Sequence, residues 1–196
     1  MIYIIKEGGL GERPSWDEYG MKFAIDASSR SSCWNVRAGS VITLDNQIIA
    51  TGYNGAPGAI KKNCLESGCR KSLKGLDYHE SLGCGECIGI HSEMNAVGHL
   101  SKRGMSKLVL YNTIFPCHTC AKDILPYNFQ KIFFKRMYSE KEAKSTLELL
   151  EEAGIEIYQL DLSPERVLDI EFNHPNVKFD VWSPEEKERI KNIFLK

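Results

Sequence analysis

The chain has 196 residues, 42% of them hydrophobic and 26% charged, and this is long enough to bury one substantial core. Its 25 Lys and Arg against 26 Asp and Glu give a formal net charge of -1, so a long nucleic-acid partner is not favoured. The sequence contains no run of about 18 apolar residues, which a membrane span would need. Residues 1–14 are too short for a secretory signal, and an acidic residue comes too early in them. We therefore expect a cytoplasmic globular protein with no membrane partner.

The first predicted elements are a helix and a hairpin. Ser15 and Glu18 have the spacing of a capping box, and apolar residues at helical spacing continue the helix to about Arg30. The stretch "SVITLDNQIIATGYNG", residues 40–55, places two runs rich in Val, Ile and Thr around Asp45-Asn46. This pattern is typical of two antiparallel strands joined by a tight turn.

Residues 56–89 follow no helical or strand period, and they contain six glycines and four of the seven cysteines. A structureless loop of this length is uncommon inside a compact domain, so we expect something other than a hydrophobic core to hold it. The cysteine count is odd, and "CGEC" (84–87) and "CHTC" (117–120) have the C-x-x-C spacing. These features indicate metal ligands rather than disulfides.

After residue 91 the pattern alternates between helices and short apolar strands. The predicted segments are a helix to about Lys102 closed by Gly104, a strand at 107–113, a helix from Pro116 to Pro126, a strand at 131–135, a helix at 139–154 that begins with a Ser139–Glu142 capping box, and a strand at 155–160. This order predicts an α/β fold with helices on both faces of one mixed sheet. We expect a domain at 1–162 and a helical C-terminal tail at 163–196, with two Ser-Pro helix starts, packed on the domain or on a neighbouring subunit.

Four residues suggest a reactive metal centre. Pro116 is suited to the first helical position, which would place Cys117 and Cys120 in the first turn, where free N–H groups stabilise thiolates. His91, at the start of the preceding helix, can reach the same point if the intervening strand is parallel to its neighbour. One His and two Cys with one open position fit catalytic zinc.

Glu93 supplies the carboxylate that such chemistry needs. Zinc lowers the pKa of a bound water, and a nearby carboxylate can then carry protons. Residues two apart do not share a face of a regular helix, so His91 and Glu93 must converge in an irregular first turn. His-x-Glu followed by Pro-Cys-x-x-Cys is the known signature of zinc-dependent nucleobase deaminases.

Further motifs point to one branch of these enzymes. In order, they are "RPSWDEY", "SRSSC", "GYNGAP", "CIGIHSEMNAV", "YNTIFPCHTCAKDI" and "RMYSEKEA". Over about residues 13–160 the chain resembles the deoxycytidylate (dCMP) deaminase family and its competence-associated bacterial relatives. The resemblance implies a cytidine deaminase-like three-layer α/β/α fold, a homo-oligomer, and dCTP and dTTP as possible effectors.

The resemblance also implies a role for individual residues. The zinc ligands would be His91, Cys117 and Cys120, with Glu93 as the proton carrier. Asn54 would bind the sugar, Tyr138 would border the pocket, and the N–H of Ser92 and the carbonyl of Phe115 would hold the pyrimidine edge. Ser92 stands where the family more often has alanine. A second, structural zinc would be held by Cys33, Cys64, Cys69 and Cys87, with Cys84 and His79 as further candidates.

The expected function is hydrolysis of dCMP to dUMP and ammonia. Alternatives are a deaminase of dCTP or CMP, one acting on a base in tRNA or single-stranded DNA, and a zinc-stabilised protein without activity. The near-neutral charge disfavours a nucleic-acid substrate, and Glu93 disfavours an inactive protein, because a purely structural zinc needs no proton carrier.

Overall fold

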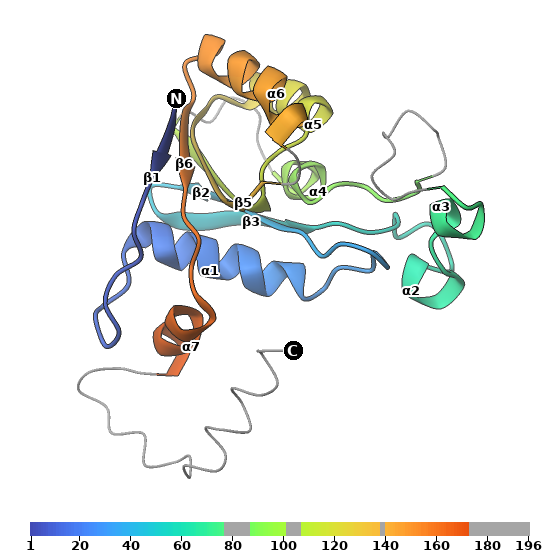
Figure 1. Ribbon diagram of the computed structural model, residues 1–196, viewed down its shortest axis with the longest axis horizontal. Coiled ribbons are helices and arrows are strands. Elements are labelled where there is room, and N and C mark those ends of the chain that lie inside the picture. Colours follow the sequence, from blue (N-terminus) through green and yellow to red (C-terminus); the bar gives the residue numbers. More distant parts are fainter. Residues whose placement is uncertain (77–86, 101–106, 138–139, 173–196) are drawn as a thin grey trace.

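A computed structural model describes residues 1–76, 87–100, 107–137 and 140–172 (Figure 1). Its sheet has the strand order β1-β6-β5-β4-β2-β3. The strands are β1 (Ile2–Ile4), β2 (Gly39–Leu44), β3 (Gln47–Tyr53), β4 (Leu108–Ile114), β5 (Phe129–Arg136) and β6 (Glu156–Gln159). The helices are α1 (Trp16–Ser28), α2 (Cys64–Ser67), α3 (Arg70–Leu73), α4 (Ser92–Gly98), α5 (His118–Ile124), the short 3-10 helix η2 (Leu125–Tyr127), α6 (Glu140–Glu152) and α7 (Pro164–Phe172).

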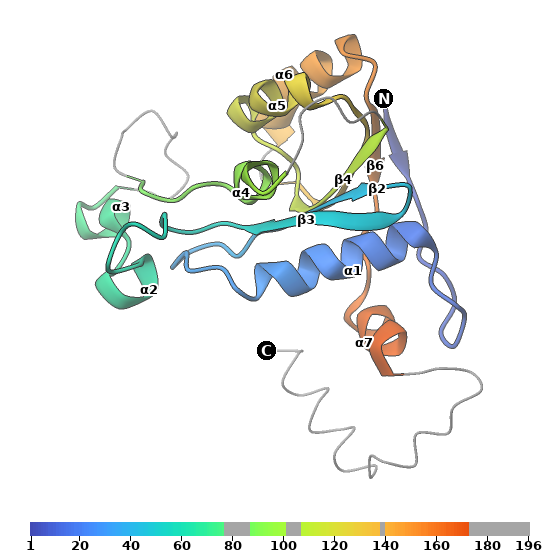
Figure 2. The ribbon, with the colours of Figure 1, turned by 180° about the vertical axis from the view of Figure 1, so that it is seen from behind.

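The sheet is covered on both faces, as predicted. Helix α1 lies on one face, and α4, α5 and α6 lie on the other (Figures 1 and 2). Strand residues alternate between the two cores: Leu110 of β4 packs with Ala96 of α4, while its neighbour Tyr111 packs with Met21 of α1. The three-layer α/β/α fold with a mixed sheet is therefore confirmed.

Strand pairing also follows the prediction, with one addition. Strands β2 and β3 are antiparallel, and the turn residues Asp45 and Asn46 have φ of 49° and 63°, the left-handed values that a tight hairpin requires. Strands β4, β5 and β6 are parallel. The sequence did not predict β1, a strand of 3 residues that pairs parallel with β6 at the edge of the sheet.

Several helix boundaries differ from the prediction. The capping box of Ser15 and Glu18 is present, but α1 ends at Ser28. Helix α5 begins at His118, because Cys117 is extended at ψ 162° and is itself the N-cap; its Sγ accepts from the N–H of Cys120. Pro116 therefore precedes the cap and does not occupy the first helical position.

The regions around α4, α6 and residues 56–89 also differ from the prediction or lie partly outside the described residues. Helix α4 ends at Gly98, so the predicted end near Lys102 was wrong. The capping box predicted at Ser139 lies outside the described residues. Residues 56–89 were wrongly expected to lack regular structure, since they contain α2 and α3, and α2 is capped by Asn63.

Helix α7 is attached to the domain by a buried cluster of charges. The Ser163-Pro164 start is confirmed, because Ser163 Oγ accepts from the N–H of Arg166. Arg166 forms ion pairs of 2.7 Å with Glu18 of α1 and with Asp169. These three side chains, called the clasp below, have exposures of 3% or less. Among the described helices, none is both long enough and apolar enough to cross a membrane.

Candidate metal centre and active site

The starts of two helices bring three potential metal ligands together. His91 Nδ1 lies 3.5 Å from Cys117 Sγ and 3.4 Å from Cys120 Sγ. His91 is the N-cap of α4 and Cys117 is the N-cap of α5, and β4 connects the two helices. Helix α5 follows β4 in the chain and therefore starts at the carboxyl end of that strand. Strands β4 and β5 are parallel, and α5 covers the same sheet face as α4. The structural condition set by the sequence argument is met.

The separation of the three ligand atoms suits zinc. In a tetrahedral site with ordinary Zn–N and Zn–S bonds, nitrogen and sulfur ligands are about 3.6 Å apart. The observed separations are close to this value, and the three ligand atoms lie within 4.8 Å of one another. Among the described residues, this is the group of His, Cys, Asp or Glu side chains compact enough to hold an ion.

Hydrogen bonds within the centre favour a thiolate. The contacts with Cys120 and with His91 lower the pKa of the Cys117 thiol to about 4, although burial opposes this. The same contact raises the pKa of Cys120. The hydrogen bond to Cys117 raises the pKa of His91. When a zinc ion binds such a group, it takes the place of the protons that the ligand atoms share.

Glu93 is enclosed beside these ligands. It is 5% exposed, and burial raises its pKa, an effect that the nearby His91 opposes. Ser92 Oγ donates to Glu93 Oε2 at 3.1 Å. His91 has extended backbone angles (φ -71°, ψ 154°) and precedes the first helical residue, so a regular helix does not separate the two side chains. A carboxyl group with a raised pKa is suited to taking and giving protons.

The end of β3 is tied to the start of α4. Gly55 and Ile90 exchange backbone hydrogen bonds of 3.1 and 2.8 Å just before His91. Asn95 Nδ2 donates to the carbonyl of Tyr53 at 2.6 Å. Asn54 lies between the two residues of this segment, Tyr53 and Gly55, that are bonded to α4 and to the residue before His91.

Asn54 supports the loop between α1 and β2. Its Oδ1 accepts from Ser31 Oγ (2.6 Å) and from the N–H of Ala38 (2.8 Å), and its Nδ2 donates to the carbonyl of Val36 (2.8 Å). An amide side chain has two N–H donors, so at most one remains for a ligand. Sequence reasoning had given Asn54 a substrate role and had missed this structural one.

The remaining predicted substrate contacts are only partly described. Phe115 is buried, and its ring meets the ring of Phe134 edge-on, with 4.9 Å between the ring centroids. In the chain, Phe115 lies between the end of β4 and Cys117. Ser92 is the first residue of α4, where backbone N–H groups have no partner within the helix. Tyr138 lies outside the described residues.

The second group of cysteines lies around α2 and α3. Cys64 is buried, and burial raises its pKa, as do the charges of Cys33, Cys69 and Cys87. Among the described residues these four thiols are not brought within 4.8 Å of one another as a group. Cys69 Sγ accepts from Asn35 Nδ2 at 3.4 Å. Cys84 and His79 lie outside the described residues.

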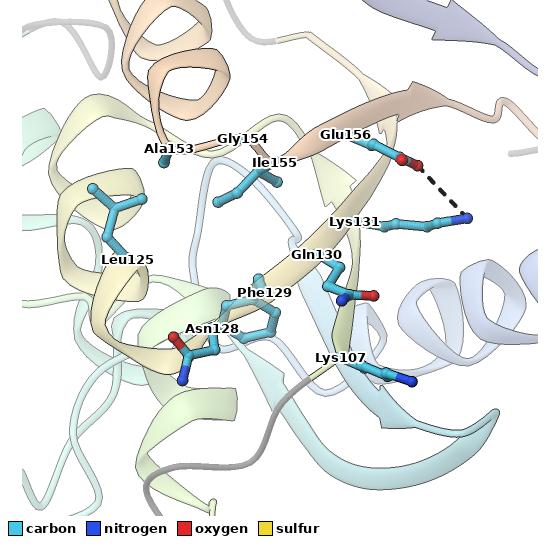
Figure 3. A pocket seen from close by; sticks show the side chains of 10 residues that line it. All are labelled: Lys107, Leu125, Asn128, Phe129, Gln130, Lys131, Ala153, Gly154, Ile155 and Glu156. Carbon is cyan, nitrogen blue, oxygen red and sulfur yellow. Dashed lines mark ion pairs between the residues drawn. The ribbon is translucent and has the colours of Figure 1, made fainter.

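A surface hollow of about 460 Å³ is distinct from the metal centre (Figure 3). Its lining comes from the residue before β4, from the starts of η2, β5 and β6, and from the residues that follow η2 and α6. Cys117 follows the opposite, carboxyl end of β4, so this hollow does not serve the centre.

Two buried polar residues were not singled out by sequence reasoning. Ser40 of β2 and Asn112 of β4 are 0% exposed and are direct partners on these two adjacent strands. A polar residue at an inward position of an otherwise apolar strand is the signal that could have identified them.

Comparison with known proteins agrees with this geometry. The family model for the cytidine and deoxycytidylate deaminase zinc-binding region matches residues 14–136. The chain belongs to this family. It is therefore related to zinc-binding deaminases, and its His, Cys, Cys group is the one that suits the metal.

Several relatives of this family member are deoxycytidylate deaminases. The protein from Saccharomyces cerevisiae is 34% identical over 154 residues, which is 78% of this chain and 47% of that one. The protein from Mycobacterium phage D29 is 33% identical and covers 63% of this chain, with 97% of its own length matched. The chain spans about half the length of the yeast relatives it matches.

Solved structures of the family have the same fold. The dCMP deaminase from the cyanophage S-TIM5, in complex with dCMP and dUMP, has a TM-score of 0.58 and 25% identity. The match covers 76% of this chain and 99% of that one.

Proposed function

We propose that the protein hydrolyses dCMP to dUMP and ammonia. The observation that carries the proposal is the convergence of His91, Cys117 and Cys120 beside the buried Glu93, in a chain of the zinc-binding deaminase family. The relatives named as deoxycytidylate deaminases, and the related structure that contains dCMP and dUMP, support this substrate.

In this proposal His91, Cys117 and Cys120 would hold the zinc, and the bound metal would supply a water of lowered pKa as the nucleophile for C4 of the pyrimidine. Glu93 takes a proton from the water and passes it to the ring nitrogen N3. Glu93 then transfers the second proton of the water to the departing amino group, which leaves as ammonia. Burial raises the pKa of Glu93 above its usual value, which is the direction that suits a carboxyl group that takes and gives protons.

Substrate orientation is assigned to groups around the centre. The N–H of Ser92 and the carbonyl of Phe115 hold the pyrimidine edge. Asn54 contributes mainly by fixing the 31–38 loop, with one N–H left for the sugar. Tyr138 borders the pocket in this proposal. We assign the catalytic domain to residues 1–162 and a C-terminal tail to 163–196, of which the structure describes α7; the second predicted Ser-Pro helix start, at Ser183, lies outside the described residues.

A second zinc is proposed for Cys33, Cys64, Cys69 and Cys87, with Cys84 and His79 as alternatives. The support is the resemblance to the family and the charges of Cys33, Cys69 and Cys87 acting on Cys64; among the described residues these four thiols do not form a group with ligand atoms within 4.8 Å of one another. Elemental analysis should then give about two zinc ions per chain, because the two ligand sets share no residue. One zinc per chain would remove the structural site.

The test of function is a substrate panel followed by loss of cytosine absorbance and release of ammonia. We expect dCMP to be deaminated well and deoxycytidine poorly. Single-stranded DNA and a tRNA anticodon stem-loop should not react. Faster turnover of dCTP or CMP would reassign the substrate, and faster turnover of the oligonucleotides, falling steeply with salt, would indicate a nucleic-acid enzyme. The same assay shows whether dCTP activates and dTTP inhibits. Oligomer formation and cytoplasmic location stay predictions.

A further inference from the structure

Four residues on adjacent strands form a row across the sheet, on the face against which the first turn of α4 packs. Gly52, Ser40, Asn112 and Phe134 are consecutive partners on β3, β2, β4 and β5. Direct partners in a sheet project their side chains to the same face, and neighbouring strands are about 4.8 Å apart. The row is thus a continuous strip of side chains on one face.

The two ends of the row identify the segments above it. At one end, a Cβ on Gly52 would lie 2.3 Å from the carbonyl oxygen of Ser92, so the first turn of α4 rests on this residue. At the other end, the ring of Phe134 packs against Phe115. The side chains of the two middle residues therefore project between the turn that carries Glu93 and the residue that precedes Pro116 and Cys117.

These middle residues, Ser40 and Asn112, are called the polar floor. Both are 0% exposed, and Ser40 Oγ and both amide atoms of Asn112 have no hydrogen-bond partner among the described residues. The next residue on β4, Thr113, shows the usual arrangement on the opposite face, where its Oγ1 accepts from the N–H of Gly39 at 3.0 Å. Buried polar groups without a protein partner are costly unless water satisfies them.

The chemistry of the polar floor matches that of water. A hydroxyl and an amide together offer donors and acceptors in both directions, which a small molecule with two donors and two acceptors can use. An alanine and a valine would fill the same strand positions without any polar requirement. The polar pair is therefore better explained by what it holds than by packing.

We propose that Ser40 and Asn112 bind buried water between the sheet and the first turn of α4, and that this hydrated floor positions the Glu93 carboxylate for proton transfer. The positioning role rests on the proposed function of Glu93. The floor acts together with the Ser92 hydroxyl, which donates to Glu93 Oε2 at 3.1 Å. Ser40 and Asn112 are positioning residues and do not touch the substrate.

Matched variants of the full-length, zinc-loaded protein separate positioning from packing. Asn112→Val and Asn112→Thr have the same shape, and only the second retains a hydroxyl. In the double variant Ser40→Ala/Asn112→Val, Tm should be unchanged or higher, because both polar groups are removed together. Its kcat on dCMP should fall roughly 10-fold to 100-fold, as for other groups that orient an active-site residue, with KM nearly unchanged. Asn112→Thr, which retains a hydroxyl, should keep a higher kcat than Asn112→Val.

The control is Thr113→Val, on the opposite face of β4. It should lower Tm through the lost contact with Gly39 and leave kcat of the folded protein unchanged. If the double variant retains wild-type kcat, or if its kcat and Tm fall together as in a packing defect, the positioning role is wrong.

A crystal structure of the zinc-loaded wild-type protein without substrate tests the water directly. Water bonded to Ser40 Oγ and to the Asn112 amide, and lost in the double variant, would support the inference. A direct hydrogen bond between the two side chains with no water would overturn it. This measurement needs no turnover, so a wild-type protein that is inactive on dCMP would contradict the proposed function while the polar floor is still decided.

Discussion

Two buried polar clusters join distant parts of this chain, and they differ in how completely their members satisfy one another. The clasp connects α1 with α7, and the metal centre connects the starts of α4 and α5. In the clasp, the Arg166 guanidinium bonds to both Glu18 and Asp169 and also donates to the carbonyl of Gly9. Asp169 in turn accepts from the N–H of Gly11. Each charged group has an ion-pair partner and further hydrogen bonds, and the two carboxylates share the one guanidinium.

The metal centre has no such internal balance. His91, Cys117 and Cys120 share protons over distances of 3.4 and 3.5 Å, and Glu93 has a raised pKa because it is buried. A cluster that is complete without a ligand stabilises the fold, whereas one whose donors converge without balancing their charges indicates a ligand. The difference predicts that mutations in the two clusters affect different measurements.

The largest expected effect is on turnover, from Glu93→Gln. General acid-base transfer is typically worth about 100-fold to 10,000-fold, and Glu93 acts more than once in the proposed cycle, so kcat should fall by at least that much. Zinc content and Tm should stay near wild-type values, because the change removes only a buried charge. A variant with a tenth of the wild-type rate would contradict the assignment of Glu93.

The next effect is on stability, from Arg166→Met. Removing the cation leaves Glu18 and Asp169 as buried carboxylates without their ion-pair partner, which typically costs about 3–5 kcal/mol. Urea unfolding should show this loss, while kcat per folded, zinc-loaded molecule stays unchanged. The matched control is the triple variant Glu18→Gln/Arg166→Met/Asp169→Asn, in which no charge is left and part of the stability should return. An equally unstable triple variant would show that shape, not charge, holds α7.

The clasp should also make stability depend on acid pH. Burial opposes ionisation of Glu18, but hydrogen bonds from Arg166 and from the N–H groups of Ser15 and Gly8 lower its pKa from 4.5 to about 2. Because the folded pKa is the lower one, the stabilisation is fully present above pH 4.5 and is lost as pH falls toward 2. The shift corresponds to about 3 kcal/mol. The free energy of unfolding should fall over this range in the wild type and much less in Glu18→Gln; equal slopes would place the acid sensitivity elsewhere.

Sequence reasoning identified the metal centre because its information is local. His91 and Glu93 are two residues apart, Cys117 and Cys120 are three apart, and α5 begins shortly after the core strand β4. The sheet and its two helix layers were predictable for a related reason, since alternating apolar strands and helices allow few arrangements. Helix ends were less predictable, because the extended backbone of Cys117 depends on its own side-chain contact with the N–H of Cys120.

The clasp could not be predicted, because Arg166 and Glu18 are 148 residues apart and each looks like an ordinary surface charge on an amphipathic helix. For the polar floor, each residue could have been noticed as a polar residue at an inward strand position, but Ser40 and Asn112 become partners only when β2 pairs with β4. Edge strand β1 has only 3 residues and depends on β6 for its pairing. These features come from tertiary contacts, which a reading of local patterns does not contain.

The smallest expected effect comes from an ion pair that resembles the clasp in distance but not in burial. Lys22 Nζ lies 2.7 Å from Asp26 Oδ2 on α1; the Lys22 side chain is only 11% exposed, but the Asp26 carboxylate is 49% exposed. Water screens this carboxylate, and pairs at i,i+4 on an exposed helix surface typically contribute about 0.3–0.5 kcal/mol. Asp26→Asn should therefore change the free energy of unfolding by no more than about 0.5 kcal/mol, and added salt should remove most of the difference. A loss as large as that of Arg166→Met would mean that distance, and not the completeness of burial and pairing, determines how much a charged contact stabilises this protein.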